Sequence, residues 1–320
     1  RIDLVHVWDE LGQVPPDWPA SVVTIGVFDG VHRGHRELIR RAVDTAAVGG
    51  MPAVVITFSP SPAEIVSVEE PPTRLSTLEQ RLKLISELGV DATLVIQFDR
   101  DWAHLSAEQF AGRVLSDALR ASQVVVGTNF RFGYRARGNV ALLKTIGESL
   151  GFGVTPVNLL DADREGDPVS STLIRGLVAE GDVAPAARML ARPHRVEGVV
   201  VRGDGRGREL GFPTANVSAT PRAALPADGV YAGRIVRDPY GPGRESLCAA
   251  ISVGTNPTFD GHEHRVEAFA YDAGDLDLYD QHIGIDFVDF IRRQENYSNP
   301  ADLVRAVERD VDQARTVLGG

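Results

Sequence analysis

Apolar residues in the first half of the chain alternate between short β-branched runs and stretches with helical spacing. The short runs, typical of buried strands, cover 22–27, 53–58, 92–98, 123–126 and 154–159. Helical spacing predicts helices from the His32–His35 region to about 47, and over 77–88, 106–118 and 139–150. A capping box, Ser106 to Gln109, opens the third of these. The alternation predicts an α/β fold with a doubly wound parallel sheet, whose ligands bind at the carboxyl ends of the strands.

The pattern changes near residue 190. Short β-rich runs separated by glycine-containing turns follow, at 196–201, 230–236, 247–253, 266–271 and 283–290. Such runs predict a compact antiparallel β-barrel. Apolar positions at helical spacing over 299–318 then predict an amphipathic C-terminal helix packed on the barrel. We therefore expect two domains, 1–186 and 187–320.

Composition narrows the class of protein. The 320 residues are 43% hydrophobic and carry a net charge of −11, which disfavours a nucleic-acid partner. No apolar run approaches the roughly 20 residues of a membrane span, and the first residues lack the layout of a signal peptide, so we expect no membrane partner. The single cysteine, Cys248, excludes an intramolecular disulfide and fits a reducing cytoplasm. The sequence leaves the oligomeric state open, a homo-oligomer included.

One stretch of the first half joins a strand, a glycine-bearing turn and a helix start. Its residues 24–35 are Thr-Ile-Gly-Val-Phe-Asp-Gly-Val-His-Arg-Gly-His. His32 and His35 fall on one face of the first helical turn, where unpaired backbone amides attract phosphate. Gly30 and Gly34 allow a ligand to approach the backbone. The alternative is an ordinary turn with two surface histidines.

Two further segments carry the polar groups that a phosphate site needs. Ser170–Arg175 (Ser-Ser-Thr-Leu-Ile-Arg) opens a short helix to about residue 180, although serine and threonine also serve as plain N-caps. In Gly205–Asn216, alternating glycine and arginine supply backbone amides and positive charge. Thr214 and Asn216 project to one side of an extended segment and offer hard oxygen ligands for Mg²⁺. A glycine-rich hairpin loop is the alternative there.

These motifs resemble those of two enzyme families. The stretch 24–35 resembles the His-x-Gly-His signature of nucleotidylyltransferases, and Ser170–Arg175 resembles the Ser-Ser-Thr-x-Ile-Arg motif of the same superfamily. Gly211–Asn216 (Gly-Phe-Pro-Thr-Ala-Asn) resembles the riboflavin kinase motif, as do 229–233, 254–259 and 265–268. Nearly the whole chain resembles the bifunctional prokaryotic riboflavin kinase/FMN adenylyltransferases. The resemblance implies that the barrel uses ATP and Mg²⁺ to phosphorylate riboflavin, and that the first domain adenylylates FMN to FAD with release of pyrophosphate.

The resemblance also implies roles for single residues. His32 and His35 donate hydrogen bonds to the ATP phosphates, Glu267 deprotonates the riboflavin 5′-hydroxyl, and Thr214 and Asn216 hold Mg²⁺. The residues expected at ATP and its phosphates are Gly26, Phe28, Asp29, Gly34, Ser170, Ser171, Thr172, Arg175, Gly205, Arg208, Gly211 and Pro213. Those expected at the flavin are Asn129, Phe130, Phe132 and Arg292.

Some of these residues have a structural alternative, and two segments depart from the family pattern. Phe130 and Phe132 are equally suited to core packing, and Glu267 to a solvent-facing strand position. The family's Asp-Pro-His-Pro appears as Ser-Pro-Ser-Pro at 59–62, so Ser59 and Ser61 lose an acid and an imidazole. Its Arg-x-Glu-x-Lys-Phe appears as Arg-Arg-Gln-Glu-Asn-Tyr at 292–297, which weakens the assignment of Arg292.

Two other functions compete with this one. The first is a nucleotidylyltransferase acting on a pantetheine, choline or nicotinate phosphate, with the barrel as a regulatory module. Thr214, Asn216 and Glu267 standing together in a kinase pattern disfavour it. The second is a flavin-binding sensor without activity, which the intact His32 and His35 disfavour.

Overall fold

The computed structural model describes residues 5–158, 169–203, 207, 210–258, 261–273, 277–295, 297 and 299–319, with the backbone alone at 255–258 and 261–264. The chain forms two compact units. One consists of Arg1–Pro72 and Leu78–Ser170, and the other of Thr73–Thr77 and Ser171–Gly320. The domain boundary expected between 186 and 187 falls within a helix of the second unit. The expected division into domains 1–186 and 187–320 stays a prediction.

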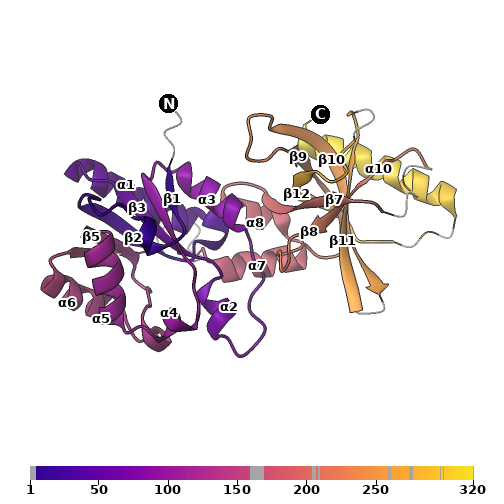
Figure 1. Ribbon diagram of the computed structural model, residues 1–320. Helices are drawn as coiled ribbons and strands as arrows, with labels where there is room; N and C mark the ends of the chain where they lie inside the picture. Colours follow the sequence, from indigo (N-terminus) through magenta and orange to yellow (C-terminus); the bar gives the residue numbers. More distant parts are fainter. Residues whose placement is uncertain are drawn as a thin grey trace. The chain divides into compact units, whose positions relative to one another are not determined.

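A parallel sheet with helices on both faces forms the first unit (Figure 1). Its strands are β1 (His6–Trp8), β2 (Ser21–Ile25), β3 (Ala53–Phe58), β4 (Ala92–Ile96), β5 (Ala121–Gly127) and β6 (Gly153–Val157). They lie in the order β1-β4-β3-β2-β5-β6, and every neighbouring pair is parallel. The doubly wound fold is thereby confirmed. The sequence missed β1 because this edge strand has three residues, two of them exposed.

Alternate side chains of these strands enter two separate cores. Val23 and Ile56 face the core that α5 and α6 cover, whereas Val22 and Val55 face the core that α1 and α3 cover. All five residues of β2 are therefore buried, as expected for a central parallel strand. The helices are α1 (Arg33–Gly49), α2 (Pro62–Val66), α3 (Leu78–Ser86), α4 (Arg100–His104), α5 (Ala107–Phe110) and α6 (Val140–Leu150).

The predicted capping box opens α5. The Ser106 amide donates to Gln109 Oε1 (2.9 Å), and the Gln109 amide donates to Ser106 Oγ (3.2 Å). The helix then continues over Ala111–Ala118 with the wider π-type spacing. The two reciprocal bonds satisfy two amides that the first helical turn leaves without intrahelical partners.

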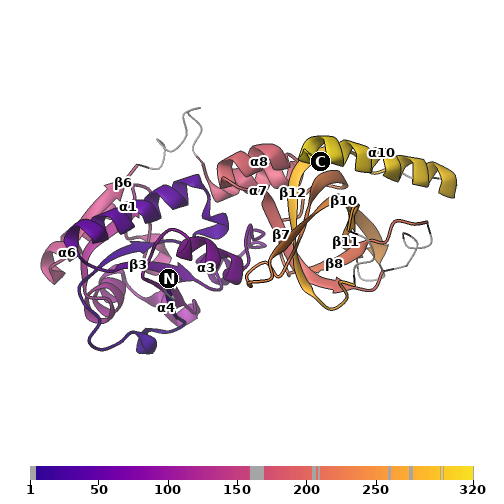
Figure 2. The ribbon, with the colours of Figure 1, turned by 90° about the horizontal axis from the view of Figure 1, so that it is seen from above.

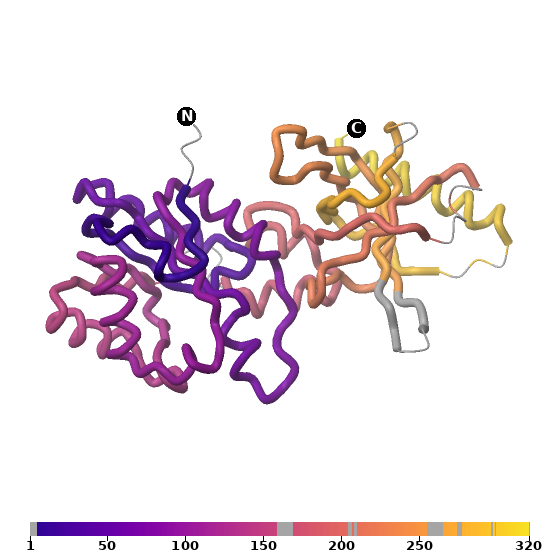
Figure 3. Tube along the Cα trace, viewed as in Figure 1, coloured from indigo at the N-terminus to yellow at the C-terminus, as the bar shows by residue number. Residues whose placement is uncertain are grey.

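A closed antiparallel barrel forms the second unit. Its strands are β7 (His194–Val201), β8 (Ala215–Ala219), β9 (Gly229–Arg237), β10 (Glu245–Thr258), β11 (Gly261–Ala270) and β12 (His282–Arg292). They close in the order β10-β11-β8-β7-β12-β9. Figure 3 traces the chain through these strands in sequence order. The predicted barrel is confirmed, and the sequence missed only β8 among its strands. The short run Ala-Asn-Val-Ser-Ala has little β propensity and is held by its neighbours β7 and β11.

Alternation along the strands separates the inside of the barrel from the outside. Val217, Ile251 and Val266 point inward with the aromatic rings of Tyr231 and Phe287. On the outside, α10 (Pro300–Leu318) lies across β9, β10 and β12 (Figure 2). Its Val311 and Ala314 pack there against a small cluster that includes Ala232, Ala250 and Tyr271. The expected C-terminal amphipathic helix is therefore present and packed on the barrel.

Two helices that precede the barrel belong to its unit. They are α7 (Ser171–Glu180) and α8 (Val183–Leu190), which pack against each other, and α8 also packs against β7 and β12. Val183 is 1% exposed and joins the interior core of the barrel. α8 thus closes one part of the barrel core.

The segment Thr73–Thr77 is also an integral part of this unit. The Arg74 amide donates to the Arg222 carbonyl (2.7 Å), and the Ala224 amide donates to the Arg74 carbonyl (2.8 Å). Thr77 Oγ1 donates to a carboxylate oxygen of Glu197 (3.0 Å), which is 1% exposed. A buried carboxylate needs such donors, so this segment offsets the desolvation of Glu197.

We expect a fragment that starts at 187 to be less stable than one that starts at 171. The shorter fragment lacks α7 and Val183, and losing one such buried apolar side chain costs about 1.5–3 kcal/mol. Its melting temperature should be about 5–10 °C lower, as measured by circular dichroism. Equal melting temperatures would mean that the barrel core is complete without these helices.

Candidate active sites

The turn between β2 and α1 contains three left-handed residues. Phe28, Gly30 and Val31 have φ angles of 53°, 77° and 40°. For a residue other than glycine this conformation costs about 1–3 kcal/mol, and it is rarest for a β-branched residue such as Val31. Phe28 and Val31 are 1% and 0% exposed and pack in the core beneath α1 and α3. Burial of these two side chains therefore holds the turn in its strained shape.

The turn delivers two stacked imidazoles to the start of α1. His32 is the N-cap, and its Nδ1 accepts the backbone amide of His35 (3.3 Å). The two rings stack with centroids 3.5 Å apart and planes 18° apart. Because Nδ1 is an acceptor, neutral His32 carries its proton on Nε2. A Cβ on Gly34 would lie 3.3 Å from the His32 ring, so the glycine makes room for this arrangement.

Phe28 packs beside the second histidine. Its ring meets the His35 ring edge-on, with centroids 5.2 Å apart and planes at 89°. A Cβ on Gly26 would lie 2.9 Å from the Phe28 ring, so only glycine fits there. Asp29 is also buried, at 8% exposure. Phe28 thus contributes a buried ring that supports His35, and any contact between Phe28 and ATP would come from its backbone.

Other predicted residues of the first unit lie on two nearby segments of the chain. The Val169 carbonyl oxygen lies 3.8 Å from the Cβ position of Gly34, so the chain leading to Ser170 passes beside the first turn of α1. Asn129 is exposed directly after β5. Phe132 is 8% exposed and stacks on Phe130 with centroids 5.4 Å apart. The side chain of Phe132 is therefore a core residue, and that of Phe130 is partly buried.

Ser61 has a structural role in this unit. It stands directly before α2, and its backbone amide donates to Glu64 Oε1 (3.0 Å). This bond starts the helix in the manner of a capping box. The serine that replaces the family's imidazole therefore supports local structure.

Ser171, Thr172 and Arg175 lie on the first turns of α7, which belongs to the second unit. Thr172 is exposed, and the other two side chains are half-buried. Their grouping with the histidines around one triphosphate stays a prediction.

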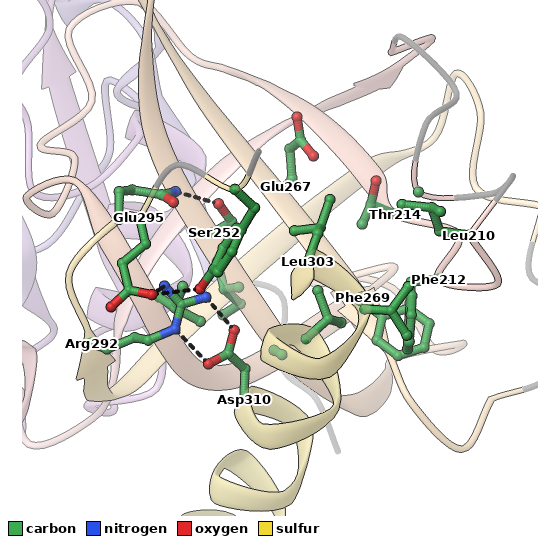
Figure 4. Close-up of a pocket in the computed structure, with 18 of the residues that line it drawn as sticks. Leu210, Phe212, Thr214, Ser252, Glu267, Phe269, Arg292, Glu295, Leu303 and Asp310 are labelled. Atoms are coloured by element: carbon green, nitrogen blue, oxygen red, sulfur yellow. Dashed lines mark hydrogen bonds and ion pairs between the residues drawn. The ribbon is translucent and has the colours of Figure 1, made fainter. Parts of the chain in front are cut away.

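The second unit contains a pocket of about 360 Å³ between the outer face of the barrel and α10 (Figure 4). Its polar wall comes from Thr214, Asn216, Ser252, Glu267 and Gln294. Its apolar wall comes from Leu210, Phe212, Phe269, Leu303, Val304 and Val307. Phe212 and Phe269 meet edge-on, with ring centroids 5.3 Å apart. The pocket can thus hold an aromatic ligand against one wall and a charged group against the other.

Strand register sets the order of the polar wall. Glu267 on β11 stands opposite Asn216 on β8 and opposite Ser252 on β10. Directly opposed residues of antiparallel strands point to the same face, and the intervening residues face the core. Asn216, Glu267 and Ser252 therefore form one row on the outside of the barrel. The structure thus brings Thr214, Asn216 and Glu267 to one pocket, and their roles in metal binding and catalysis stay predictions.

Two other side chains close the end of this row. Gln294 Nε2 donates to Ser252 Oγ (2.7 Å) and to the Val253 carbonyl (3.1 Å). Gln294 stands where the family pattern has glutamate, which could donate neither bond. The glutamine therefore ties the chain after β12 to β10 at the edge of the pocket.

Arg292 lies at the base of the pocket in a bidentate ion pair with Asp310 of α10. Its Nε and Nη2 donate to the two carboxylate oxygens at 2.8 and 2.7 Å, and Nη1 donates to the Arg293 carbonyl at 3.0 Å (Figure 4). Asp310 is 5% exposed. Hydrogen bonding to Asp310 raises the pKa of Arg292 above its usual value, so the guanidinium stays charged. Arg292 thus fastens α10 to the end of β12.

Sequence reasoning missed the residues that come from α10 and from β10. Asp310 had a detectable signal: it follows Val307 by three residues and precedes Ala314 by four, so a carboxylate falls on the apolar face of the helix. A charge at such a position is normally paired. Ser252 and Gln294 had no comparable signal, because their contact depends on strand register.

Four other predicted residues belong to the segment before β8. Gly205 and Arg208 lie outside the described residues, whereas Gly211 has a left-handed φ of 88° and Pro213 is exposed.

Comparison with known proteins finds two family models along the chain. The family model for FAD synthetase matches residues 14–173, and that for riboflavin kinase matches residues 190–318. The bifunctional riboflavin kinase/FMN adenylyltransferase of Escherichia coli K12 is 35% identical over 99% of this chain and 98% of its own length. This chain belongs to that family. The corresponding protein of Pseudomonas fluorescens is 35% identical over 96% of each chain.

The fold recurs in a crystal structure from Streptococcus pneumoniae, described as a macrolide-efflux protein. It matches with a TM-score of 0.86 and 30% identity over 98% of this chain and 99% of its own. The architecture is therefore shared along nearly the whole length.

In the part of our chain that the structure describes, no helix is both long and apolar enough to cross a membrane. Within the same part, no group of three or more His, Cys, Asp or Glu residues could hold a metal ion.

We expect Asp310→Asn to lower the free energy of unfolding by about 1–3 kcal/mol, because the substitution leaves Arg292 without its charged acceptor. Urea unfolding followed by fluorescence measures this loss. Asp312→Asn, two residues further on the exposed side of α10, is the matched control and should be neutral. Equal stability of the two variants would mean that the ion pair does not fasten α10.

Proposed function

We propose that the pocket of the second unit phosphorylates riboflavin and that the His32–His35 turn of the first unit transfers the adenylyl group of ATP to FMN. The observation that carries this proposal is the row on the barrel, in which Glu267 stands opposite Asn216 beside Thr214 in one pocket. A base, oxygen ligands for a metal and an aromatic wall are together what a flavin kinase needs.

In adenylyl transfer, an FMN phosphate oxygen attacks the α-phosphorus of ATP. The bond from the α-phosphorus to the bridging oxygen breaks, and pyrophosphate leaves. His32, protonated on Nε2, and His35 donate hydrogen bonds to the phosphates, and the amides at the start of α1 add their partial positive charge. These groups stabilise charge that builds up on the leaving group. No side chain has to act as a nucleophile.

In the kinase reaction, the riboflavin 5′-hydroxyl oxygen attacks the γ-phosphorus of ATP. The bond between the γ-phosphorus and the bridging oxygen breaks, ADP leaves, and the hydroxyl proton passes to the Glu267 carboxylate. Phe212 and Phe269 pack against the flavin ring. Arg292 lines the base of this pocket and supports it through its ion pair with Asp310.

Thr214 and Asn216 would hold Mg²⁺ together with the phosphate oxygens of ATP. A hydroxyl and an amide oxygen suit this hard cation, which binds through few protein ligands when phosphates supply the others. Bound there, Mg²⁺ offsets the negative charge of the transferred phosphoryl group.

The single free cysteine, Cys248, supports a cytoplasmic location for the protein.

Incubation with riboflavin and ATP, followed by chromatography of the flavins, tests the proposal. We expect FMN and FAD to form in sequence. Absence of flavin products would favour a nucleotidylyltransferase with another substrate, and bound but unchanged riboflavin would favour a sensor.

We expect His32→Ala and His35→Ala to lower FAD formation from FMN by about 10²–10³-fold, the usual cost of losing one transition-state donor. FMN formation from riboflavin should stay nearly constant, because Glu267, Asn216 and Thr214 belong to the other unit. His6→Ala, at an exposed position of β1, is the control. A parallel loss of both activities in a folded variant would refute the assignment of two separate sites.

We expect Glu267→Gln to lower the kcat of riboflavin phosphorylation by about 10²–10⁴-fold, the range for a general base. Glutamine keeps the size of the side chain but accepts no proton, so riboflavin affinity should change little and conversion of FMN to FAD should persist. Glu245→Gln, an exposed strand glutamate of β10, is the matched control. An unchanged kcat at saturating substrates would show that Glu267 is not the base.

A further inference from the structure

The carbonyl oxygen of Val27 accepts hydrogen bonds from two side chains that lie outside the predicted motif in the sequence. Arg81 Nη1 of α3 donates at 2.6 Å, and Thr57 Oγ1 of β3 donates at 3.0 Å. Arg81 is 7% exposed and Thr57 is 0% exposed. Two buried donors therefore converge on one backbone oxygen directly before the left-handed turn.

This oxygen fixes the plane of the peptide between Val27 and Phe28. Phe28 is the first of the left-handed residues, and its carbonyl accepts the Val31 amide (3.0 Å). From Val31 the chain enters His32, the N-cap of α1. A rotation of the Val27–Phe28 peptide would therefore change the position of both the Phe28 ring, which packs on His35, and the His32 backbone.

We infer that Arg81 and Thr57 are positioning residues for adenylyl transfer, and that they act through the Val27 carbonyl on the placement of His32 and His35. Nothing in the motif itself points to them, since Arg81 lies 46 residues beyond His35 in the sequence. The inference rests on the proposed role of the two histidines. A charged donor forms the stronger hydrogen bond, so Arg81 carries the larger share.

A buried arginine could also serve stability alone. A positioning role predicts a different kinetic result, because a misplaced donor lowers the rate of the chemical step while substrate binding elsewhere persists. A stability role predicts that the folded fraction of a variant keeps its kcat. The ratio of the effects on kcat and on KM therefore separates the two roles.

The test compares full-length Arg81→Met, Arg81→Lys and Lys83→Met in conversion of FMN to FAD. Arg81→Met keeps much of the apolar volume and removes the donor, and we expect its kcat to fall about 10–100-fold with KM for FMN within about 3-fold. Arg81→Lys keeps one charged donor and should recover at least part of that loss. Lys83→Met changes an exposed side chain two residues away and should have no effect.

Thr57→Val keeps the shape of the side chain and tests the same carbonyl if Arg81→Met does not fold. We expect its kcat to fall about 2–10-fold, as for loss of one neutral hydrogen bond. Because the two donors share the Val27 oxygen, each partly compensates for loss of the other, and the double variant Thr57→Val/Arg81→Met, which removes both, should lose more than the product of the two single losses.

Three outcomes would overturn the inference. They are an unchanged kcat in folded Arg81→Met and Thr57→Val, a parallel loss of riboflavin phosphorylation, and single losses that simply multiply in the double variant. His35→Ala, measured in the same assay, keeps the two proposals apart. If His35→Ala abolishes FAD formation while the Arg81 and Thr57 variants are normal, only the present inference fails. If His35→Ala is active, the proposed role of the turn fails first.

Discussion

The packing of Phe28 and Val31 into the core beneath α1 and α3 is the constraint on which the first site depends. Both residues adopt left-handed backbone conformations that an exposed loop would not maintain. Burial of the two side chains offsets this strain, and as a result the chain enters α1 with His32 as N-cap and with the two imidazoles stacked. The geometry of the histidines thus depends on the burial of two apolar side chains.

The second site depends on a different constraint, the register of an antiparallel barrel. A shift of one residue between β8 and β11 would turn Asn216 or Glu267 into the interior, where an uncompensated polar group is costly. The apolar neighbours Ala215, Val217, Val266 and Ala268 therefore fix the functional row through their own burial. α10 then adds Leu303, Val304 and Val307 to the apolar wall, and the ion pair between Arg292 and Asp310 ties the helix to the barrel.

The sequence predicted both folds because their patterns are strong: buried β-branched runs alternate with amphipathic helices in one half, and short strands alternate with turns in the other. It also predicted Thr214, Asn216 and Glu267 as one group, since the motifs carry them. It did not predict β1 or β8, which are short and which neighbouring strands hold in place. It could not predict the partners of Val27 and Ser252, because these contacts join segments far apart in the chain. It missed Asp310, the partner of Arg292, although a carboxylate on the apolar face of α10 indicated a paired charge.

Both proposed reactions transfer a phosphorus-containing group of ATP directly to an oxygen of the second substrate, without a covalent intermediate on the protein. Catalysis then comes from holding donors, a base and positive charge to within about half an ångström of the positions that the reaction requires. Under this demand, a residue that touches no substrate can matter as much as one that does. Gln294 and Asp310 fix the edge and base of one pocket, and Arg81 and Thr57 fix a peptide plane behind the other site. In this protein the functional residues therefore extend beyond the motifs into the buried hydrogen bonds that hold the motifs in shape.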